Sequence, residues 1–175
     1  FIAKEMGFPI EKIVFATNAN RTIPDFLETG FWQPRPTIPT LASAMDVGNP
    51  SNMERFFHVF DDRKTLLDTL RAVSVTDEQI TNQIRSEYLD NQILCCPHTA
   101  TALHVYREFS NKEKKETHWC IVATAHPSKF EQTVEPIIGE EIAVPERLRA
   151  LLELDASFVT IDPELNQLIE AIASA

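Results

Sequence analysis

Three side chains capable of chemistry lie close together in the stretch 124–129. Thr124 offers a hydroxyl, His126 a titratable imidazole and Lys129 a cation. A hydroxyl at the end of a strand can hydrogen-bond a ring nitrogen of a ligand. A purely structural interpretation fits the same residues: Thr124 would bond a nearby backbone group and His126 would pack at a strand–helix corner.

Two apolar runs of the sequence predict buried strands that would position such side chains. They are Lys12 to Thr17 and His118 to Ala123. In open parallel sheets, ligands bind beyond the carboxyl ends of the strands. This rule selects the loops 17–20, 97–101 and 124–129, and a loop bounded by glycine and proline at 43–52 is a further candidate.

Helical patterns alternate with these runs along the chain. Helices are expected at 23–29, 52–57, 63–72, 77–90, 99–109, 132–138, from 144 onwards and at 163–174, with a short strand at 73–75. The alternation predicts an α/β fold with a mostly parallel sheet and helices on both faces. We expect residues 1–145 to form one α/β domain and residues 146–175 a helical tail packed on it.

Composition and charge exclude several classes of function. The formal net charge is −10 and no basic stripe compensates for it, so nucleic-acid binding is not expected. No apolar run reaches the length of a membrane span, and no leader peptide follows Phe1. These features favour a cytoplasmic protein, and a chain that opens within a helical pattern is interpreted as part of something longer.

The three cysteines favour reduced, buried thiols over disulfides or a metal site. Their number is odd and Cys95 and Cys96 are adjacent, which argues against a disulfide framework. The more specific alternative is a zinc site. Adjacent cysteines have a poor spacing for zinc ligands, so no metal is expected. The candidate zinc ligands would be Cys95, Cys96, His98, His118 and Cys120.

Two further classes of function remain as alternatives. In a cysteine hydrolase, Cys95 or Cys96 would be the nucleophile with His98 or His126 as its base. The apolar surroundings predict a raised thiol pKa, which works against this interpretation. The other alternative is a non-catalytic α/β module that binds a small ligand or regulates a partner.

Several segments, taken together, resemble threonine synthase. They are Ile13 to Asn20, Leu41 to Arg55, Pro97 to Ala100 and Val122 to Phe130, which occur in the family's order with similar spacing. The resemblance covers the chain up to about residue 145 and corresponds to the C-terminal part of the family. It implies part of the large domain of a fold-type II enzyme dependent on pyridoxal 5'-phosphate (PLP). The implied reaction converts O-phospho-L-homoserine and water into L-threonine and phosphate.

The resemblance also implies roles for particular residues. Thr124 matches the hydroxyl residue that faces the PLP ring nitrogen, and the loop expected to line the ring matches Ser43, Ala44, Met45 and Asp46. Asn52 and Arg55 fall on a family motif and are candidates for substrate binding, as is His126. Arg55 is equally expected to pair with Glu54 or Asp61 on a helix surface, and His126 to shape its loop.

The residues that the family uses to hold PLP covalently and to bind its phosphate have no counterpart here. The resemblance implies a lysine and a Gly-Asn-Phe-Gly type loop, both upstream of the matching region. We therefore expect no catalytic residue in this chain, no activity of the chain alone and no cofactor bound by it. Surface left open by the missing part predicts a possible homodimer.

Overall fold

The computed structural model describes residues 1–60 and 63–174. They divide into two compact units, residues 1–142 and residues 143–175, which are treated separately below. The helices of the first unit, with the 3₁₀ turns marked η, are α1 (Ile2–Glu5), α2 (Thr22–Thr29), η1 (Ser43–Met45), α3 (Met53–Val59), α4 (Arg63–Thr69), α5 (Asp77–Asn91), α6 (Pro97–Arg107), α7 (Asn111–Glu116), η2 (Pro127–Phe130) and α8 (Glu131–Ile138).

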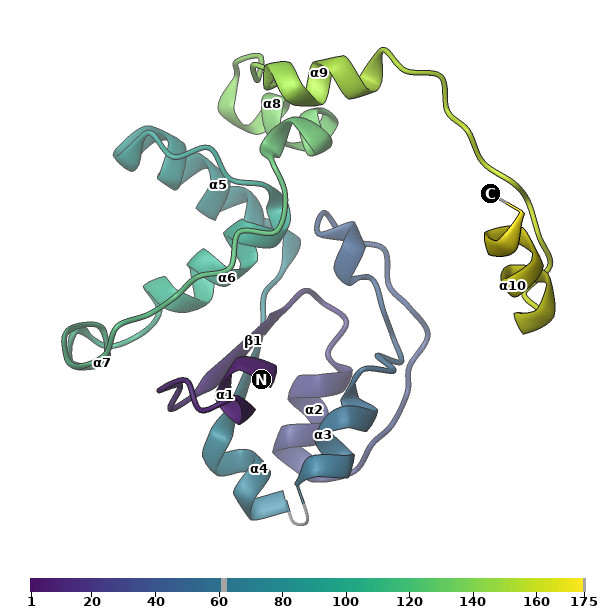
Figure 1. The fold of residues 1–175 in the computed structure, drawn as a ribbon. Coiled ribbons are helices and arrows are strands. Elements are labelled where there is room, and N and C mark those ends of the chain that lie inside the picture. Colours follow the sequence, from purple (N-terminus) through teal and green to yellow (C-terminus); the bar gives the residue numbers. More distant parts are fainter. Residues whose placement is uncertain (61–62, 175) are drawn as a thin grey trace. The chain divides into compact units, whose positions relative to one another are not determined.

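Two parallel strands form the sheet of the first unit (Figure 1). β1 (Ile13–Thr17) pairs with β2 (Leu70–Ser74), with Ile13 opposite Leu70 and Thr17 opposite Ser74. The apolar, β-branched residues of β1 suit a strand that is covered on both faces.

Each face of the sheet packs against its own apolar cluster. Phe15 lies on one face, against a cluster in which Phe26, Met53 and Phe56 bring together α2 and α3. Val14 and Ala16 lie on the other face, against the larger cluster of α5, α6 and α8. This division follows from the alternation of side chains along a strand. The predicted α/β fold, with a parallel sheet and helices on both faces, is confirmed.

Several helix ends lie where the sequence predicts them. Thr76 and Gln79 form the expected capping box at the start of α5. Gly30 and Gly139 follow α2 and α8 with positive φ angles of 82° and 76°, which glycine adopts at little cost. The helix expected over 63–72 ends earlier, at Thr69, because β2 takes up the next residues.

The strand expected at His118 to Ala123 is wrong. The segment is extended, but it has no strand beside it, and an extended chain becomes a strand only by pairing with a neighbour. Cys120 within it is exposed, which also corrects the expectation of three buried thiols, while Cys95 and Cys96 are buried as predicted.

The second unit contains two short helices with exposed apolar side chains. They are α9 (Glu146–Leu152) and α10 (Leu165–Ala173). Leu165, Leu168, Ile169 and Ile172 of α10 repeat at helical spacing and are all exposed. The predicted packing of this tail on the first unit stays a prediction. In the described part of the chain, no helix has the length and apolar character needed to cross a membrane.

Candidate functional site

The chain turns sharply at the carboxyl end of β1, where a buried amide network holds it. The Asn18 side chain is fully buried, and its Nδ2 donates to Thr40 Oγ1 at 2.8 Å, Ala42 O at 3.2 Å and Asp46 Oδ1 at 2.8 Å. Its Oδ1 accepts from the backbone and side-chain nitrogens of Asn20, at 2.9 and 3.0 Å. A single side chain thereby joins the end of β1 to the loop 40–46.

Asp46 completes this network from the other side. Its carboxylate accepts from Thr40 N at 3.0 Å and from Thr40 Oγ1 at 2.7 Å, in addition to Asn18. The family resemblance implies that Asp46 belongs to the loop lining the cofactor ring. In the structure its carboxylate holds the loop, and the neighbouring turn η1 presents Ala44 and Met45 to the cavity described below.

His98 fastens η1 to α6. The backbone N–H of Ala44 donates to His98 Nε2 at 3.0 Å, which requires an unprotonated Nε2. The residue is 8% exposed, and the centroid of its ring lies 4.8 Å from that of Phe130 in η2. Burial lowers the pKa of His98 from its ordinary 6.5, with Asp46 opposing the shift. His98 lies in the first turn of α6, at the positive end of the helix dipole, and this position also disfavours the protonated, positively charged form of its ring.

The loop after residue 123 is shaped by His126. His126 Nδ1 lies 2.7 Å from Ser128 Oγ and accepts from Ser128 N at 3.2 Å, which caps η2. Thr124 and Lys129, on either side of His126, line the cavity, whereas His126 does not. These hydrogen bonds are those of a residue that shapes its own loop, which is the structural role expected for His126.

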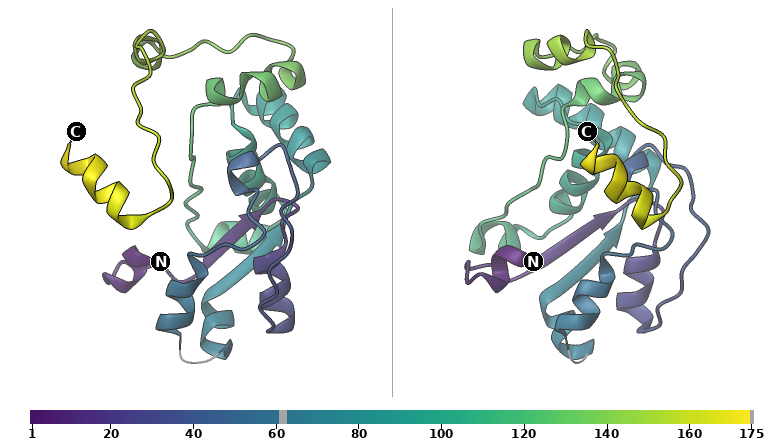
Figure 2. Two further views of the ribbon diagram at one scale, coloured as in Figure 1. Left: turned by 90° about the vertical axis from the view of Figure 1, so that its right-hand side faces the viewer. Right: turned by 45° about the vertical axis from the view of Figure 1, so that its right-hand side comes forward.

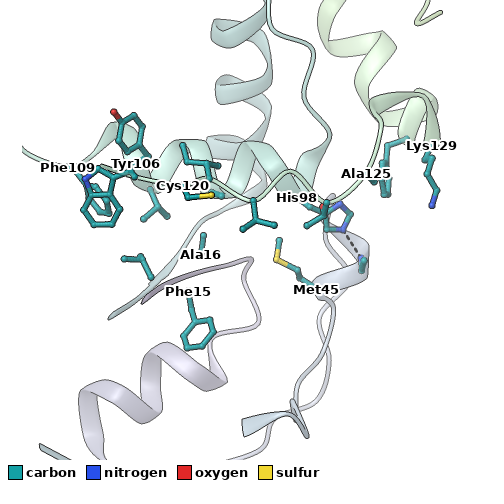
Figure 3. A pocket seen from close by; sticks show the side chains of 18 residues that line it. Phe15, Ala16, Met45, His98, Tyr106, Phe109, Cys120, Ala125 and Lys129 are labelled. Carbon is teal, nitrogen blue, oxygen red and sulfur yellow. Dashed lines mark hydrogen bonds between the residues drawn. The ribbon is translucent and has the colours of Figure 1, made fainter. Parts of the chain in front are cut away.

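A cavity of about 540 Å³ lies between β1, α6, η1 and the segment 119–125 (Figure 3). One end is apolar and is lined by Tyr106 and Phe109, while His98, Ala125 and Lys129 lie at the other end. Met45 and Ala16 line it between these ends. The volume falls in the range of small-molecule sites.

A second cavity, of about 420 Å³, lies at the carboxyl end of β1 beside α3. Asn52 lines it, together with Asn20 and Asn49, and Met45 lines both cavities. Arg55 is exposed and lines neither of the two. Within residues 1–60 and 63–174 it makes no ion pair with Glu54, and Asp61, its other expected partner, lies outside them.

The structure therefore brings together some of the predicted site residues and not others. Thr124, Ala44 and Met45 line one cavity; Asn52 lines the next. Ser43, Asp46, Arg55 and His126 line neither of them. The sequence did not predict the buried acceptor role of His98, for which its position directly after Pro97 at a helix start was the available signal.

The metal and thiol alternatives find no support in this geometry. Among the described residues, no three His, Cys, Asp or Glu side chains are grouped so as to hold a metal ion. Burial raises the pKa of the Cys95 thiol to about 12, with smaller contributions from Cys96 and Glu87. The predicted raised thiol pKa is confirmed for Cys95, which is therefore unsuited to act as a nucleophile near neutral pH.

Comparison with known proteins gives one consistent family. The family model described as threonine synthase, C-terminal, matches residues 99–172. Threonine synthase from Buchnera aphidicola of Schizaphis graminum is 37% identical over 169 residues, covering 97% of this chain and 38% of that protein. Threonine synthase from Escherichia coli is 35% identical over 153 residues, covering 87% of the chain and 35% of that protein.

Solved structures agree with the sequence relatives. The crystal structure of Escherichia coli threonine synthase matches with a TM-score of 0.77 and 30% identity, over 99% of this chain and 40% of that one. PLP-bound threonine synthase from Brucella melitensis matches with a TM-score of 0.77 and 26% identity, over 99% and 42% respectively. The chain thus spans well under half the length of the relatives that it matches.

Proposed function

This chain matches the C-terminal part of threonine synthases in sequence and in fold, and from this premise we propose that it forms one wall of a PLP site. The complete enzyme would convert O-phospho-L-homoserine and water into L-threonine and phosphate. The observation that carries the proposal is that Thr124 and Met45, distant in sequence, line one cavity of suitable size.

The residues present fit the ring of this cofactor. Met45 and Ala44 supply an apolar surface, and Thr124 supplies a neutral hydroxyl at the same cavity. When bound, PLP supplies an electron sink, and a hydroxyl beside its ring nitrogen leaves that sink weaker than a carboxylate would. This suits a reaction in which departure of phosphate carries electrons away.

The proposed contribution of this chain is orientation of the ring. The Asn18–Asp46 network fixes the loop that carries η1, and His98 fixes η1 against α6 through the Ala44 N–H. Both therefore hold the turn that presents Met45 and Ala44 to the cavity, and His98 also lines the cavity itself. We assign Asp46 and Ser43 to this supporting structure, and keep Asn52 and Arg55 as candidates for substrate binding beside the second cavity.

The covalent anchor and the phosphate cradle are proposed to come from the remaining part of the enzyme. No glycine lines the larger cavity in the described residues, so a glycine-rich phosphate loop is not supplied there. Lys129 is the lysine that lines it, from the exposed end of η2. We propose that the catalytic lysine is a different one, and that residues 1–145 belong to the cofactor-binding domain with 146–175 as its tail.

A chimera tests the proposal. The N-terminal part of the Escherichia coli enzyme, joined to this chain at the start of the matched region, should release phosphate from O-phospho-L-homoserine in the presence of PLP. Thr124→Ala in the chimera should lower kcat about tenfold or more, because the ring-nitrogen contact acts during the reaction. The matched control Ser110→Ala, which removes a hydroxyl from the cap of α7, should leave kcat within about twofold.

Borohydride reduction of the same chimera locates the covalent anchor. Peptide mapping should find the reduced cofactor on a lysine of the N-terminal part, and Lys129→Ala should not abolish it. Attachment at Lys129 would contradict the proposed division of roles. A folded chimera that binds PLP without releasing phosphate would instead favour a non-catalytic ligand-binding or regulatory module.

A further inference from the structure

One end of the larger cavity carries hydrogen-bond donors and a positive charge. The chain has a formal net charge of −10, yet no Asp or Glu within residues 1–60 and 63–174 lines this cavity. Lys129 is the one charged residue that lines it in those ranges, and His98 lies at the same end (Figure 3). A cavity with this distribution of charge favours an anionic ligand.

The ring of His98 has a donor without a partner. Because the Ala44 N–H donates to Nε2 at 3.0 Å, the neutral ring carries its proton on Nδ1. Within the described chain Nδ1 makes no hydrogen bond, and it is not one of the enclosed polar atoms that lack one. The residue is 8% exposed and lines the cavity, so an acceptor can reach Nδ1 from the cavity.

The start of α6 adds partial positive charge at the same place. This helix has 11 residues, and His98 follows Pro97 in its first turn. The Thr99 N–H is bound by Cys96 Sγ, and the Ala100 N–H is bound by Cys96 O. The backbone N–H of His98 makes no hydrogen bond in the described part of the chain. Free N–H groups and the dipole at the start of a helix both favour an anion.

The charge of Lys129 is not neutralised by a carboxylate of the described residues. Lys129 belongs to η2, which follows the extended segment that runs alongside the sheet (Figure 2). Its side chain is exposed, and none of the ion pairs in the described ranges includes it. The charge of Asp46 acts on His98, but Asp46 does not line the cavity, and its carboxylate accepts hydrogen bonds from Asn18 and Thr40.

We propose that His98 and Lys129 form a subsite for a phosphoryl group, which holds the phosphate of the substrate and then the phosphate that the reaction releases. This inference rests on the proposed function, in which cofactor and substrate each carry a phosphate. The cofactor phosphate is proposed to bind a glycine-rich loop outside this chain, and no glycine of the described residues lines the cavity. The substrate phosphate therefore remains for this end of the cavity.

A phosphoryl group suits these donors better than a carboxylate does. It carries up to two negative charges and three acceptor oxygens, so it can accept from the imidazole N–H, the start of α6 and the lysine at once. Lys129 is exposed at the cavity, which leaves a route by which released phosphate can depart. His98 and Lys129 are thus assigned to binding, and neither is assigned a proton transfer.

Titration of this chain with inorganic phosphate tests the subsite in the absence of cofactor and substrate. In protein labelled with nitrogen-15 at histidine, the Nδ1–H resonance of His98 should move in a saturable manner. The resonances of His58, which lines neither cavity, should stay in place. No saturable change at His98 in about 50 mM phosphate would overturn the proposal, because a site weaker than that has no use at ordinary substrate concentrations.

Lysine variants of this chain locate the bound phosphate. Lys129→Ala should raise the Kd for phosphate about fivefold or more, because a charge-assisted hydrogen bond is lost, and Lys129→Arg should retain most of the affinity. The matched control Lys115→Ala removes an exposed lysine that lines neither cavity and should bind phosphate as the wild type does. An unchanged Kd in Lys129→Ala, or a loss of affinity in Arg55→Ala alone, would overturn the proposal.

Related ligands identify which chemical group the subsite recognises. O-phospho-L-homoserine should move the His98 resonance as inorganic phosphate does, and L-homoserine, which keeps the carboxylate and lacks the phosphate, should not. An equal response to L-homoserine would assign the subsite to a carboxylate. Tighter binding of pyridoxine 5'-phosphate than of O-phospho-L-homoserine would assign it to the cofactor. Either result would overturn the proposal.

The chimera separates this inference from the proposed function. In it, Lys129→Ala should raise the KM for O-phospho-L-homoserine and the inhibition constant of inorganic phosphate about fivefold, and should lower kcat by a smaller factor. Turnover with both constants unchanged would support the reaction and overturn the subsite. Saturable binding of phosphate at His98 of this chain, without phosphate release by the chimera, would support the subsite and contradict the reaction.

Discussion

The two walls of the larger cavity are held in different ways. On one side, Asn18 is fully buried, and its side chain makes hydrogen bonds to four residues around the end of β1. On the other side, residues 118–125 make no backbone hydrogen bond within the described chain, and Thr124 is exposed. The first wall is thus stabilised by its own side chains, whereas the second is held at its ends, by Phe109 and by η2.

A substitution at Asn18, in the first wall, is expected to cause the largest loss of unfolding free energy. Asn18→Ala removes three donated and two accepted hydrogen bonds at a site without access to water, and leaves Asp46 with fewer donors. The free energy of unfolding should fall by about 3 kcal/mol, measured by urea denaturation of this chain. A loss below about 1 kcal/mol would show that the loop 40–46 does not depend on this side chain.

A smaller effect is expected at His98, which joins η1 to α6. His98→Phe keeps an aromatic ring against Phe130 but leaves the Ala44 N–H without its acceptor, and should cost about 1 kcal/mol. His98→Gln retains an acceptor and should recover part of the loss. Urea denaturation at pH 7.5 compares the three proteins, and equal stabilities would contradict the role assigned to the Ala44–His98 bond.

The same histidine makes stability depend on pH. The pKa of His98 is lowered in the folded state, so the unfolded chain takes up its proton first as the pH falls. The stabilisation that unprotonated His98 gives the folded state is complete above about pH 6.5, the ordinary pKa of histidine. It is lost as the pH falls through the lower pKa that His98 has in the folded state. The wild type should lose more unfolding free energy than His98→Gln between pH 7.5 and 5; parallel curves would disprove this.

The smallest effect is expected on the second wall. Thr124→Val keeps the shape of the side chain, and because Thr124 is exposed, the unfolding free energy of this chain should change by less than about 0.5 kcal/mol. Asn18→Ala, measured by urea denaturation in the same experiment, should lose far more unfolding free energy than Thr124→Val. A loss of about 2 kcal/mol or more at Thr124 would show that the second wall is self-supporting after all.

The sequence predicted the elements with strong local signals. The Thr76–Gln79 box and the glycines at 30 and 139 mark helix ends, and both follow from backbone chemistry that acts within a few residues. The apolar run at β1 likewise predicted its strand. These features depend little on what lies elsewhere in the molecule.

The features that the sequence missed depend on distant partners. Residues 118–123 have the composition of a strand, yet pairing requires a neighbour that nothing in their own composition supplies. The acceptor role of His98 arises from the Ala44 N–H, which lies far away in sequence. The hydrogen bonds of the Asp46 carboxylate likewise come from Thr40 and Asn18, which lie elsewhere in the sequence.

The buried Asn18 amide has a consequence for the chemical ageing of the molecule. Hydrolysis of that amide would replace a nitrogen that donates to Asp46 Oδ1 at 2.8 Å by a carboxylate oxygen. A carboxylate on the fully buried side chain of residue 18 would then face the partly buried carboxylate of Asp46, and one of the two would have to keep a proton. The loop 40–46 therefore depends on an uncharged donor at this one atom, which a single deamidation would remove.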